Sequence, residues 1–172
     1  YRTTLADGRV APLSALDYKG MDAGYASQPG EVVNYVENHD NPTLWDIHAV
    51  KLPQATSAAE RARAQLLGAA FVAFSQGVPY FHAGMDVLRS KSLDRNSFDS
   101  GDWFNRLDWT YSDNGFGAGL PPEPDNGKDW GLLRPVLRNA KAKPSPADIA
   151  WMHDAFRDLL RTMHHGGNVA LL

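Results

Sequence analysis

A strong helix pattern with a short strand pattern on each side constrains this chain more than any other feature. The helix pattern begins with Ser57 and Glu60, which stand in the S-x-x-E arrangement of a capping box, and it ends at Gly77. Residues 31–36 and 78–82 are rich in β-branched and aromatic residues, which is typical of short buried strands. This order predicts two parallel strands joined by a helical crossover. Apolar residues at helical spacing predict the buried face of the helix, namely Leu66, Leu67, Ala70, Phe71, Ala73 and Phe74.

The rest of the chain offers few further elements. Residues 1–30 are rich in turn-forming pairs, and we expect mostly loop or short irregular helix there. Residues 84–144 form a long polar stretch, which in a compact domain indicates a functional loop. A last helix is predicted from Ser145-Pro146, with an apolar stripe that contains Ile149, Met152 and Phe156, and it should end near residues 166–167. So few strands cannot close a barrel, and the α/β pattern indicates an incomplete domain.

Composition narrows the range of functions only slightly. The chain has 172 residues, 43% of them hydrophobic and 22% charged, which are ordinary values for a globular protein. A net charge of −3 gives no reason to expect nucleic acid or an acidic membrane surface as a partner. We expect no transmembrane helix, since no long apolar run is present, and residues 1–10 show no signal-peptide pattern, which leaves the compartment open. The absence of cysteine excludes disulfides and thiolate chemistry.

A cluster of polar residues follows the first predicted strand. It runs from Glu37 to Asn41 and is closed by Pro42. The carboxyl ends of parallel strands are where α/β barrels keep their catalytic groups, so His39 and Asp40 stand apart from the other loop carboxylates, which are more often solvated or turn-forming. An aspartate there, with a neighbouring histidine that donates to a sugar hydroxyl, fits the oxocarbenium-like transition state of glycoside hydrolysis.

Longer motifs extend this observation along the chain. Residues 33–41, V-N-Y-V-E-N-H-D-N, resemble the motif at the seventh strand of the α-amylase superfamily. Several further segments, in the same order, resemble the pullulanase or limit-dextrinase subgroup: Thr43-Leu44-Trp45-Asp46, Gln76-Gly77-Val78-Pro79-Tyr80, residues 88–92, residues 100–106, and Gly119-Leu120-Pro121-Pro122 with Asp125-Asn126 beyond. Two departures stand out, because Glu37-Asn38 replaces the usual S-K and Pro42 replaces the usual Gln.

The resemblance implies a fold and a mechanism. Residues 1–172 would be a partial catalytic domain, the part of a (β/α)8 barrel that holds strands seven and eight, their helices and the long loop after strand eight. The family uses a retaining mechanism with three carboxylates, and only the one that stabilises the transition state maps here, onto Asp40, with His39 beside it. The motifs of the nucleophile and of the acid have no counterpart, so we expect a fragment that is inactive alone. The alternatives are a non-catalytic carbohydrate-binding or inert remnant, or a piece of an isoamylase or glycogen-debranching enzyme.

The resemblance also implies ligands and partners. The expected substrate is an α-glucan such as pullulan or a limit dextrin, and no nucleic acid or membrane partner is expected. No cofactor is required for the chemistry; family members bind Ca²⁺, but no metal ligands are assigned in this chain. The residues expected to bind sugar, with bonding inside the loop as the alternative, are Asn41, Arg89, Asp94, Arg95 and Asn96. Trp45 and Trp103 are either stacking platforms or packing residues, and His82 is expected to be buried.

Overall fold

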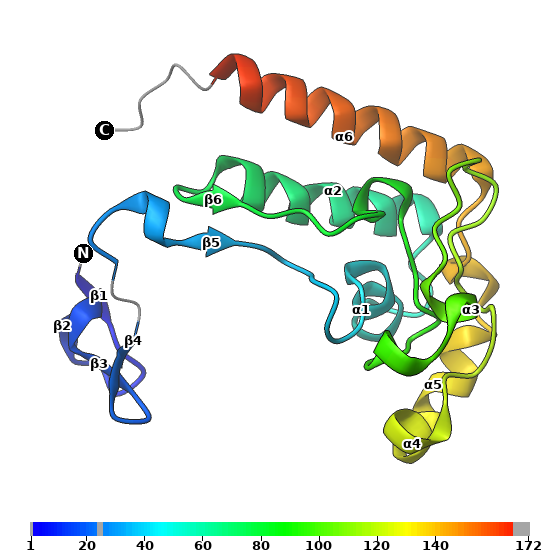
Figure 1. The fold of residues 1–172 in the computed structure, drawn as a ribbon, viewed down its shortest axis with the longest axis horizontal. Coiled ribbons are helices and arrows are strands. Elements are labelled where there is room, and N and C mark those ends of the chain that lie inside the picture. Colours follow the sequence, from blue (N-terminus) through cyan, green and yellow to red (C-terminus); the bar gives the residue numbers. More distant parts are fainter. Residues whose placement is uncertain (1, 24–25, 167–172) are drawn as a thin grey trace. The chain divides into compact units, whose positions relative to one another are not determined.

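The computed structural model of the chain describes residues 2–23 and 26–166 (Figure 1). The chain divides into two compact units. The smaller unit is built from the chain up to Val33 together with Gln76–Val78, and the larger unit from Asn34–Ser75 and the chain from Pro79 onward. Each unit is described separately below.

The smaller unit carries two antiparallel β-hairpins. Their strands are β1 (Arg2–Thr4) with β2 (Val10–Pro12), and β3 (Leu16–Tyr18) with β4 (Met21–Ala23). Short 3₁₀ helices cover Leu13–Ala15 and Pro29–Glu31. The prediction of mostly loop was therefore wrong for the strands, because turn pairs such as Asp7-Gly8 connect hairpin strands too short to show alternation. Gly8 and Gly20 both have φ of +83°, which suits glycine at a hairpin turn.

The two strands predicted around the crossover helix are present but shorter than expected. They are β5 (Val33–Asn34) and β6 (Val78–Pro79). The amide of Val78 donates to the carbonyl of Val32 at 2.7 Å, and the amide of Tyr80 donates to the carbonyl of Asn34 at 2.9 Å. Both partners advance by two residues in the same direction, so the strands run parallel, as predicted. Within the described ranges these short strands form no closed barrel.

The larger unit is mainly helical. Its α-helices are α1 (Leu44–Lys51), α2 (Ala58–Phe74), α3 (Asp102–Asn105), α4 (Glu123–Asn126), α5 (Trp130–Leu137) and α6 (Pro146–Gly166). Between them lie 3₁₀ turns at Met85–Val87, Ser97–Asp99, Gly127–Asp129 and Ala140–Ala142. The stretch predicted as one long loop, residues 84–144, thus contains three short helices. They escaped prediction because α3 and α4 have one turn each and α5 contains Pro135.

Helices α2 and α6 lie side by side, and both contribute residues to the core of the larger unit (Figure 1). Helix α6 contributes the predicted stripe, with Ile149 and Met152 fully buried. Its start is also as predicted, since Ser145 and Asp148 exchange hydrogen bonds around Pro146. The central residues of the core are Trp45, Ala49, Ala62, Ala69, Met85, Leu88, Ile149 and Met152.

The predicted buried face of α2 was wrong in part, since Leu66 packs against the core but half of the named residues do not. The residues that α2 buries are Ala58, Arg61, Ala62, Gln65, Ala69 and Val72. Leu67, Phe71 and Phe74, which were expected inside, are 59%, 66% and 55% exposed. The helix carries small residues on one side and large apolar residues on the other, so its apolar periodicity fits either side. The side that the structure buries carries the smaller apolar residues together with Arg61 and Gln65, whose side chains bond to backbone carbonyls of neighbouring segments.

A buried arginine fixes the connection between α1 and α2. Arg61 is fully buried, and its guanidinium donates to the backbone carbonyls of His48, Pro53 and Thr56. The His48 carbonyl lies in the last turn of α1, and those of Pro53 and Thr56 lie in the connection to α2. The bonds hold the end of α1 against the first turns of α2.

No helix in the described part of the chain is both long and apolar enough to cross a membrane.

We predict that the capping box of α2 contributes measurably to stability. The hydroxyl of Ser57 accepts from the amide of Glu60, whose carboxylate accepts from the amide of Ser57. Ser57→Ala should lower the free energy of unfolding by about 1 kcal/mol, as measured by urea denaturation. Ser100→Ala is the control, since it removes a hydroxyl but keeps the backbone bond from that residue to Ser97. Equal losses in the two variants would contradict the prediction.

Candidate active site

The polar loop after β5 is short, exposed and tightly turned. The side chains of His39 and Asp40 are 79% and 69% exposed, with His39 Nε2 3.7 Å from Asp40 Oδ2. The amide of Asp40 donates to Asn38 Oδ1 at 2.8 Å, and Asn41 has φ of +60°. Asparagine tolerates this left-handed conformation better than most residues, so the turn brings Asp40 and Asn41 to the surface together. Helix α1 begins directly afterwards, capped by Thr43.

An open polar pocket of about 520 Å³ lies beside this loop. Residues from the loop after β5, from the segment before Ser97–Asp99 and from the region of α4 line it: Asp40, Asn41, Arg95, Asn96, Pro124, Asp125 and Lys128. The lining includes carboxylates, amides and cations, so the pocket offers both donors and acceptors. It can therefore bind a neutral ligand that is rich in hydroxyl groups.

The structure brings together four of the residues predicted to contact substrate. Asp40, Asn41, Arg95 and Asn96 all line the pocket. His39 does not line it but lies exposed next to Asp40. The amide side chain of Asn96 is oriented by a 3.0 Å bond to Asp125 Oδ2.

Arg89 and Asp94 point into the protein instead. Arg89 donates to the carbonyls of Ala83 at 3.2 Å and Asn105 at 2.9 Å, so its guanidinium braces the loop. Asp94 is fully buried, and its Oδ1 accepts from the amide of Asn96 at 2.9 Å and from Asn126 Nδ2 at 3.1 Å. Both residues have the bonding inside the loop that was the alternative to sugar binding.

Sequence reasoning did not name Asp125 and Lys128 as pocket residues. They lie in α4 and in the following turn, some thirty residues beyond Asn96 in the sequence. The available signal was the Gly119–Pro122 segment followed by Asp125-Asn126. It marked a family-like loop but gave no indication of which side chains face the pocket.

The two tryptophans and His82 have different surroundings in the structure. Trp45 is fully buried and donates to the carbonyl of Ala142 at 3.2 Å, so it is a packing residue. Trp103 is 58% exposed, and Arg106 lies over its ring at 5.3 Å from the centroid. His82 is buried as predicted.

Glu37, one of the departures noted in the sequence, is buried and contacts His82, which in turn contacts Arg89. Its carboxylate accepts from the amide of Leu44, and Oε1 lies 3.5 Å from His82 Nδ1. His82 Nε2 lies 3.3 Å from Arg89. A glutamate at this position therefore connects the end of β5, the segment after β6 and the start of α1.

A second buried group, centred on Asp46, lies at the start of α1. Its carboxylate accepts from the hydroxyl of Ser90 and from the amide of Lys91 at 2.9 Å. Burial raises the pKa of the Asp46 carboxyl to about 6, although the bonds from Ser90, Lys91 and Thr43 act in the opposite direction. The ammonium of Lys91, which is 1% exposed, donates to the carbonyl of His39 at 3.0 Å.

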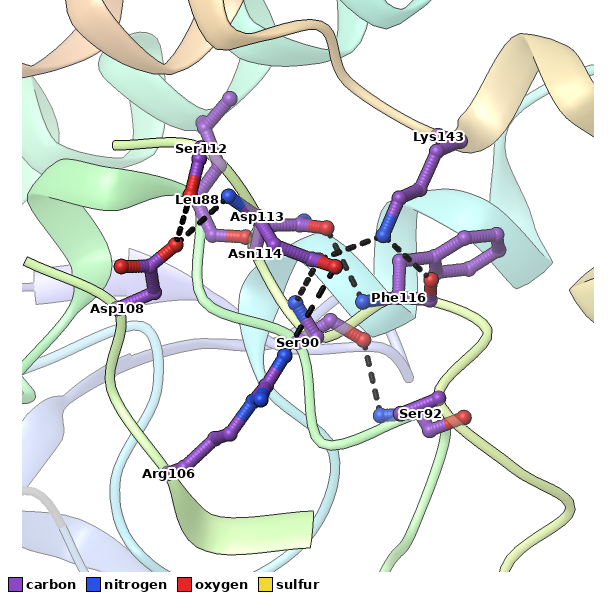
Figure 2. A network of polar contacts seen from close by, with 12 residues as sticks. Leu88, Ser90, Ser92, Arg106, Asp108, Ser112, Asp113, Asn114, Phe116 and Lys143 are labelled. Carbon is purple, nitrogen blue, oxygen red and sulfur yellow. Dashed lines mark hydrogen bonds and ion pairs between the residues drawn. The ribbon is translucent and has the colours of Figure 1, made fainter. Parts of the chain in front are cut away.

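The segment that carries Ser90 and Lys91 is braced from its other side, as Figure 2 shows. The amide of Ser90 donates to the carbonyl of Asn114, whose side chain donates to the carbonyl of Leu88, each at 2.7 Å. Lys143 holds the following turn through Asp113 at 2.6 Å and the carbonyl of Phe116 at 2.9 Å.

The close approach between these two segments requires glycine at position 115. Gly115 has φ of +84°, and a Cβ there would lie 2.7 Å from the carbonyl oxygen of Ser90.

Among the side chains that the structure describes, no group of three or more potential metal ligands is found.

Comparison with known proteins gives a consistent result. Residues 111–165 match the family described as "Alpha-1,6-glucosidases, pullulanase-type, C-terminal". The chain is 46% identical to Pullulanase 1, chloroplastic, of Arabidopsis thaliana over 162 residues, and 40% identical to a pullulanase of Klebsiella aerogenes over 153 residues. These alignments cover 94% and 89% of this chain, but only 17% and 14% of the two relatives. The chain therefore spans less than a fifth of either protein.

Solved structures agree with the sequence comparison. The chain matches Klebsiella pneumoniae pullulanase complexed with maltotriose with a TM-score of 0.83 and 37% identity, over 95% of this chain and 15% of that one. The match to apo pullulanase of the same organism also has a TM-score of 0.83, at 37% identity over 95% of this chain and 18% of that one.

We predict that Asp46 makes stability depend on pH in an unusual direction. Its pKa rises from an ordinary value of 3.8 to about 6, so the folded state holds a proton that the unfolded chain releases in this range. The stabilisation by Asp46 is thus present at acidic pH, is lost as the pH rises through this window, and stays lost above about pH 6. The expected total is roughly 3 kcal/mol.

The measurement compares wild type with Asp46→Asn by urea denaturation across this pH range. Because the introduced amide cannot titrate, the difference in unfolding free energy between the two proteins isolates the effect of Asp46. The unfolding free energy of wild type should fall relative to that of the variant as the pH rises. A difference that does not change with pH would contradict the prediction.

Proposed function

We propose that this chain, which belongs to the pullulanase-type α-1,6-glucosidases, is the part of a starch-debranching glycoside hydrolase that carries Asp40 and the sugar-binding residues around it. The proposed substrates are α-1,6 branch linkages in pullulan and limit dextrins. The chain would correspond to strands seven and eight of a (β/α)8 barrel, with their helices and the loop after strand eight. The observation that carries the proposal is the polar pocket in which Asp40 lies with Asn41, Arg95 and Asn96.

The chemistry of the pocket supports a glucan ligand. A glucose unit presents hydroxyl groups that both donate and accept hydrogen bonds, and the pocket offers carboxylates, amides and cations. The backbone N–H of Asn96 donates to the buried Asp94 and its side-chain amide donates to Asp125, so Asn96 is already oriented before a ligand arrives. The Klebsiella pneumoniae relative was solved as a complex with maltotriose, an α-glucan.

The proposed mechanism is retaining hydrolysis with three carboxylates. An aspartate nucleophile and a glutamic acid that donates a proton would act with Asp40, and neither has a matching motif in these 172 residues. Asp40 would stabilise the positive charge that develops at the anomeric carbon and the ring oxygen, while His39 donates to a sugar hydroxyl. Carboxylates alone suffice for this chemistry, so no cofactor is proposed for it.

Replacing Asp40 tests the proposal in the complete protein that contains this chain. Asp40→Asn keeps the size of the side chain but removes its charge, so kcat on pullulan should fall by about 10³-fold or more while KM stays within about tenfold. His39→Ala should lower kcat less, because a hydrogen bond to a neutral hydroxyl provides only part of the transition-state stabilisation.

The control is Asp154→Asn, at an exposed carboxylate of α6 that pairs with Arg157 on the surface. It should leave kcat unchanged, and thermal melting of all variants checks folding. If Asp40→Asn kept more than about a tenth of the wild-type kcat, the assignment of Asp40 would be wrong.

We also predict that the 172-residue chain alone has no debranching activity. Without a nucleophile and a general acid, both covalent catalysis and proton transfer are lost, and each contributes orders of magnitude to the rate. The measurement is the release of reducing ends from pullulan by the purified chain, with a mock purification as the control. Activity above the mock, abolished by Asp40→Asn, would contradict the prediction.

A further inference from the structure

We infer that Lys91 is a positioning residue for Asp40, because its buried ammonium fixes the peptide group that precedes Asp40. The inference rests on the proposed function, since it assigns Lys91 a role only if Asp40 acts on substrate. Lys91 itself does not line the pocket. It acts through the backbone carbonyl of His39, to which it donates at 3.0 Å.

The loop that carries Asp40 needs such a support because its own side chains point to solvent. His39 and Asp40 are largely exposed, and their mutual contact of 3.7 Å is too long for a hydrogen bond. Asn41 adds a backbone conformation with φ of +60°, which is less common for residues other than glycine. Exposed side chains around such a turn do little to fix the direction in which a carboxylate points.

The peptide group between His39 and Asp40 is instead held at both of its polar atoms. Its carbonyl oxygen accepts from Lys91 Nζ at 3.0 Å, and its N–H donates to Asn38 Oδ1 at 2.8 Å. A peptide group is planar, so fixing both atoms fixes the plane and with it the position of the Asp40 Cα. The bond to Asn38 is local to the loop. The bond from Lys91 is the one that connects this peptide to the segment after β6.

Lys91 is well suited to this task because it is itself rigidly held. It is 1% exposed, and its backbone amide donates to the buried carboxylate of Asp46. Its neighbours Ser90 and Ser92 are fixed by Asn114 and by one another, as Figure 2 shows. A charged donor to a carbonyl in a buried setting forms a stronger bond than a neutral one, because water does not compete for it.

Charges of both signs surround the Lys91 ammonium. Burial lowers its pKa below the ordinary value and the charge of Arg89 acts in the same direction, while the negative charges of Asp46, Asp94 and Glu37 oppose this shift. These three carboxylates are all buried. None of the described carboxylates forms an ion pair with Lys91 within 4.0 Å, so its ammonium remains directed at the His39 carbonyl.

The test is steady-state kinetics on pullulan with the complete protein that contains this chain. Lys91→Met keeps the length and volume of the side chain but removes the donor. If Lys91 orients Asp40, kcat should fall by about 10²-fold with KM nearly unchanged, since a misplaced catalytic group affects the transition state more than ground-state binding. Lys91→Arg keeps a charged donor and should recover most of the rate.

The matched control is Lys143→Met. Lys143 also donates to a backbone carbonyl, that of Phe116, and it contacts an acidic residue, Asp113, but it does not touch the loop of Asp40. Its replacement should lower the melting temperature without lowering kcat. If Lys91→Met fails to fold, Lys91→Gln replaces it with the same expectation, because glutamine is polar yet too short to reach the His39 carbonyl.

Asp40→Asn is measured in parallel so that two kinds of failure can be distinguished. If Asp40→Asn abolishes activity while the folded Lys91 variants keep kcat within about threefold of wild type, the positioning role is wrong and the proposed function stands. The positioning role is also wrong if Lys91→Met and Lys143→Met lower kcat equally, because the loss would then follow stability alone. If Asp40→Asn keeps its activity, the proposed function fails, and the role of Lys91 fails with it.

Discussion

The buried carboxylate of Asp46 is the contact on which the candidate site depends. It lies in the first turn of α1, directly after the loop of Asp40, and it accepts hydrogen bonds from Ser90 and Lys91, more than forty residues further along the chain. These bonds join the segment after β5 to the segment after β6. Burying a carboxylate is costly, and the raised pKa of about 6 shows that the hydrogen bonds offset this cost only in part.

This arrangement explains how an exposed pocket can have a defined geometry. The pocket side chains belong to the loop after β5, to the segment before Ser97–Asp99 and to the region of α4. Below them, buried polar groups connect the three segments: Lys91 reaches the carbonyl of His39, and Asp94 joins the amide of Asn96 to the side chain of Asn126. Binding groups that are oriented in advance by buried partners need less reordering when a ligand arrives. The stabilising bonds thus lie beneath the site, where solvent does not weaken them.

Local signals in the sequence predicted elements well wherever a few neighbouring residues decide the outcome. The caps at Ser57 and Ser145 predicted where α2 and α6 begin, because a capping box is completed within four residues. The hairpins of β1 to β4 and the helix α5 were missed, since strands of three residues show no alternation and α5 is short and contains a proline, Pro135. The buried side of α2 was predicted only in part, because apolar residues occupy both sides and tertiary packing decides which of them faces the core.

In the candidate site, too, some features follow from neighbouring residues and others from contacts between distant parts of the chain. The sequence by itself determined the motif around His39 and Asp40, its place directly after a strand, and the likeness to pullulanases, because these are properties of consecutive residues. Only the tertiary structure decided which distant side chains meet that motif. Arg89 and Asp94 turn inward to brace the loop, Asp125 and Lys128 enter the pocket, and Lys91 reaches the carbonyl of His39. The direction of a loop side chain depends on backbone conformation and on buried partners far away in the sequence, and no short stretch of residues encodes either.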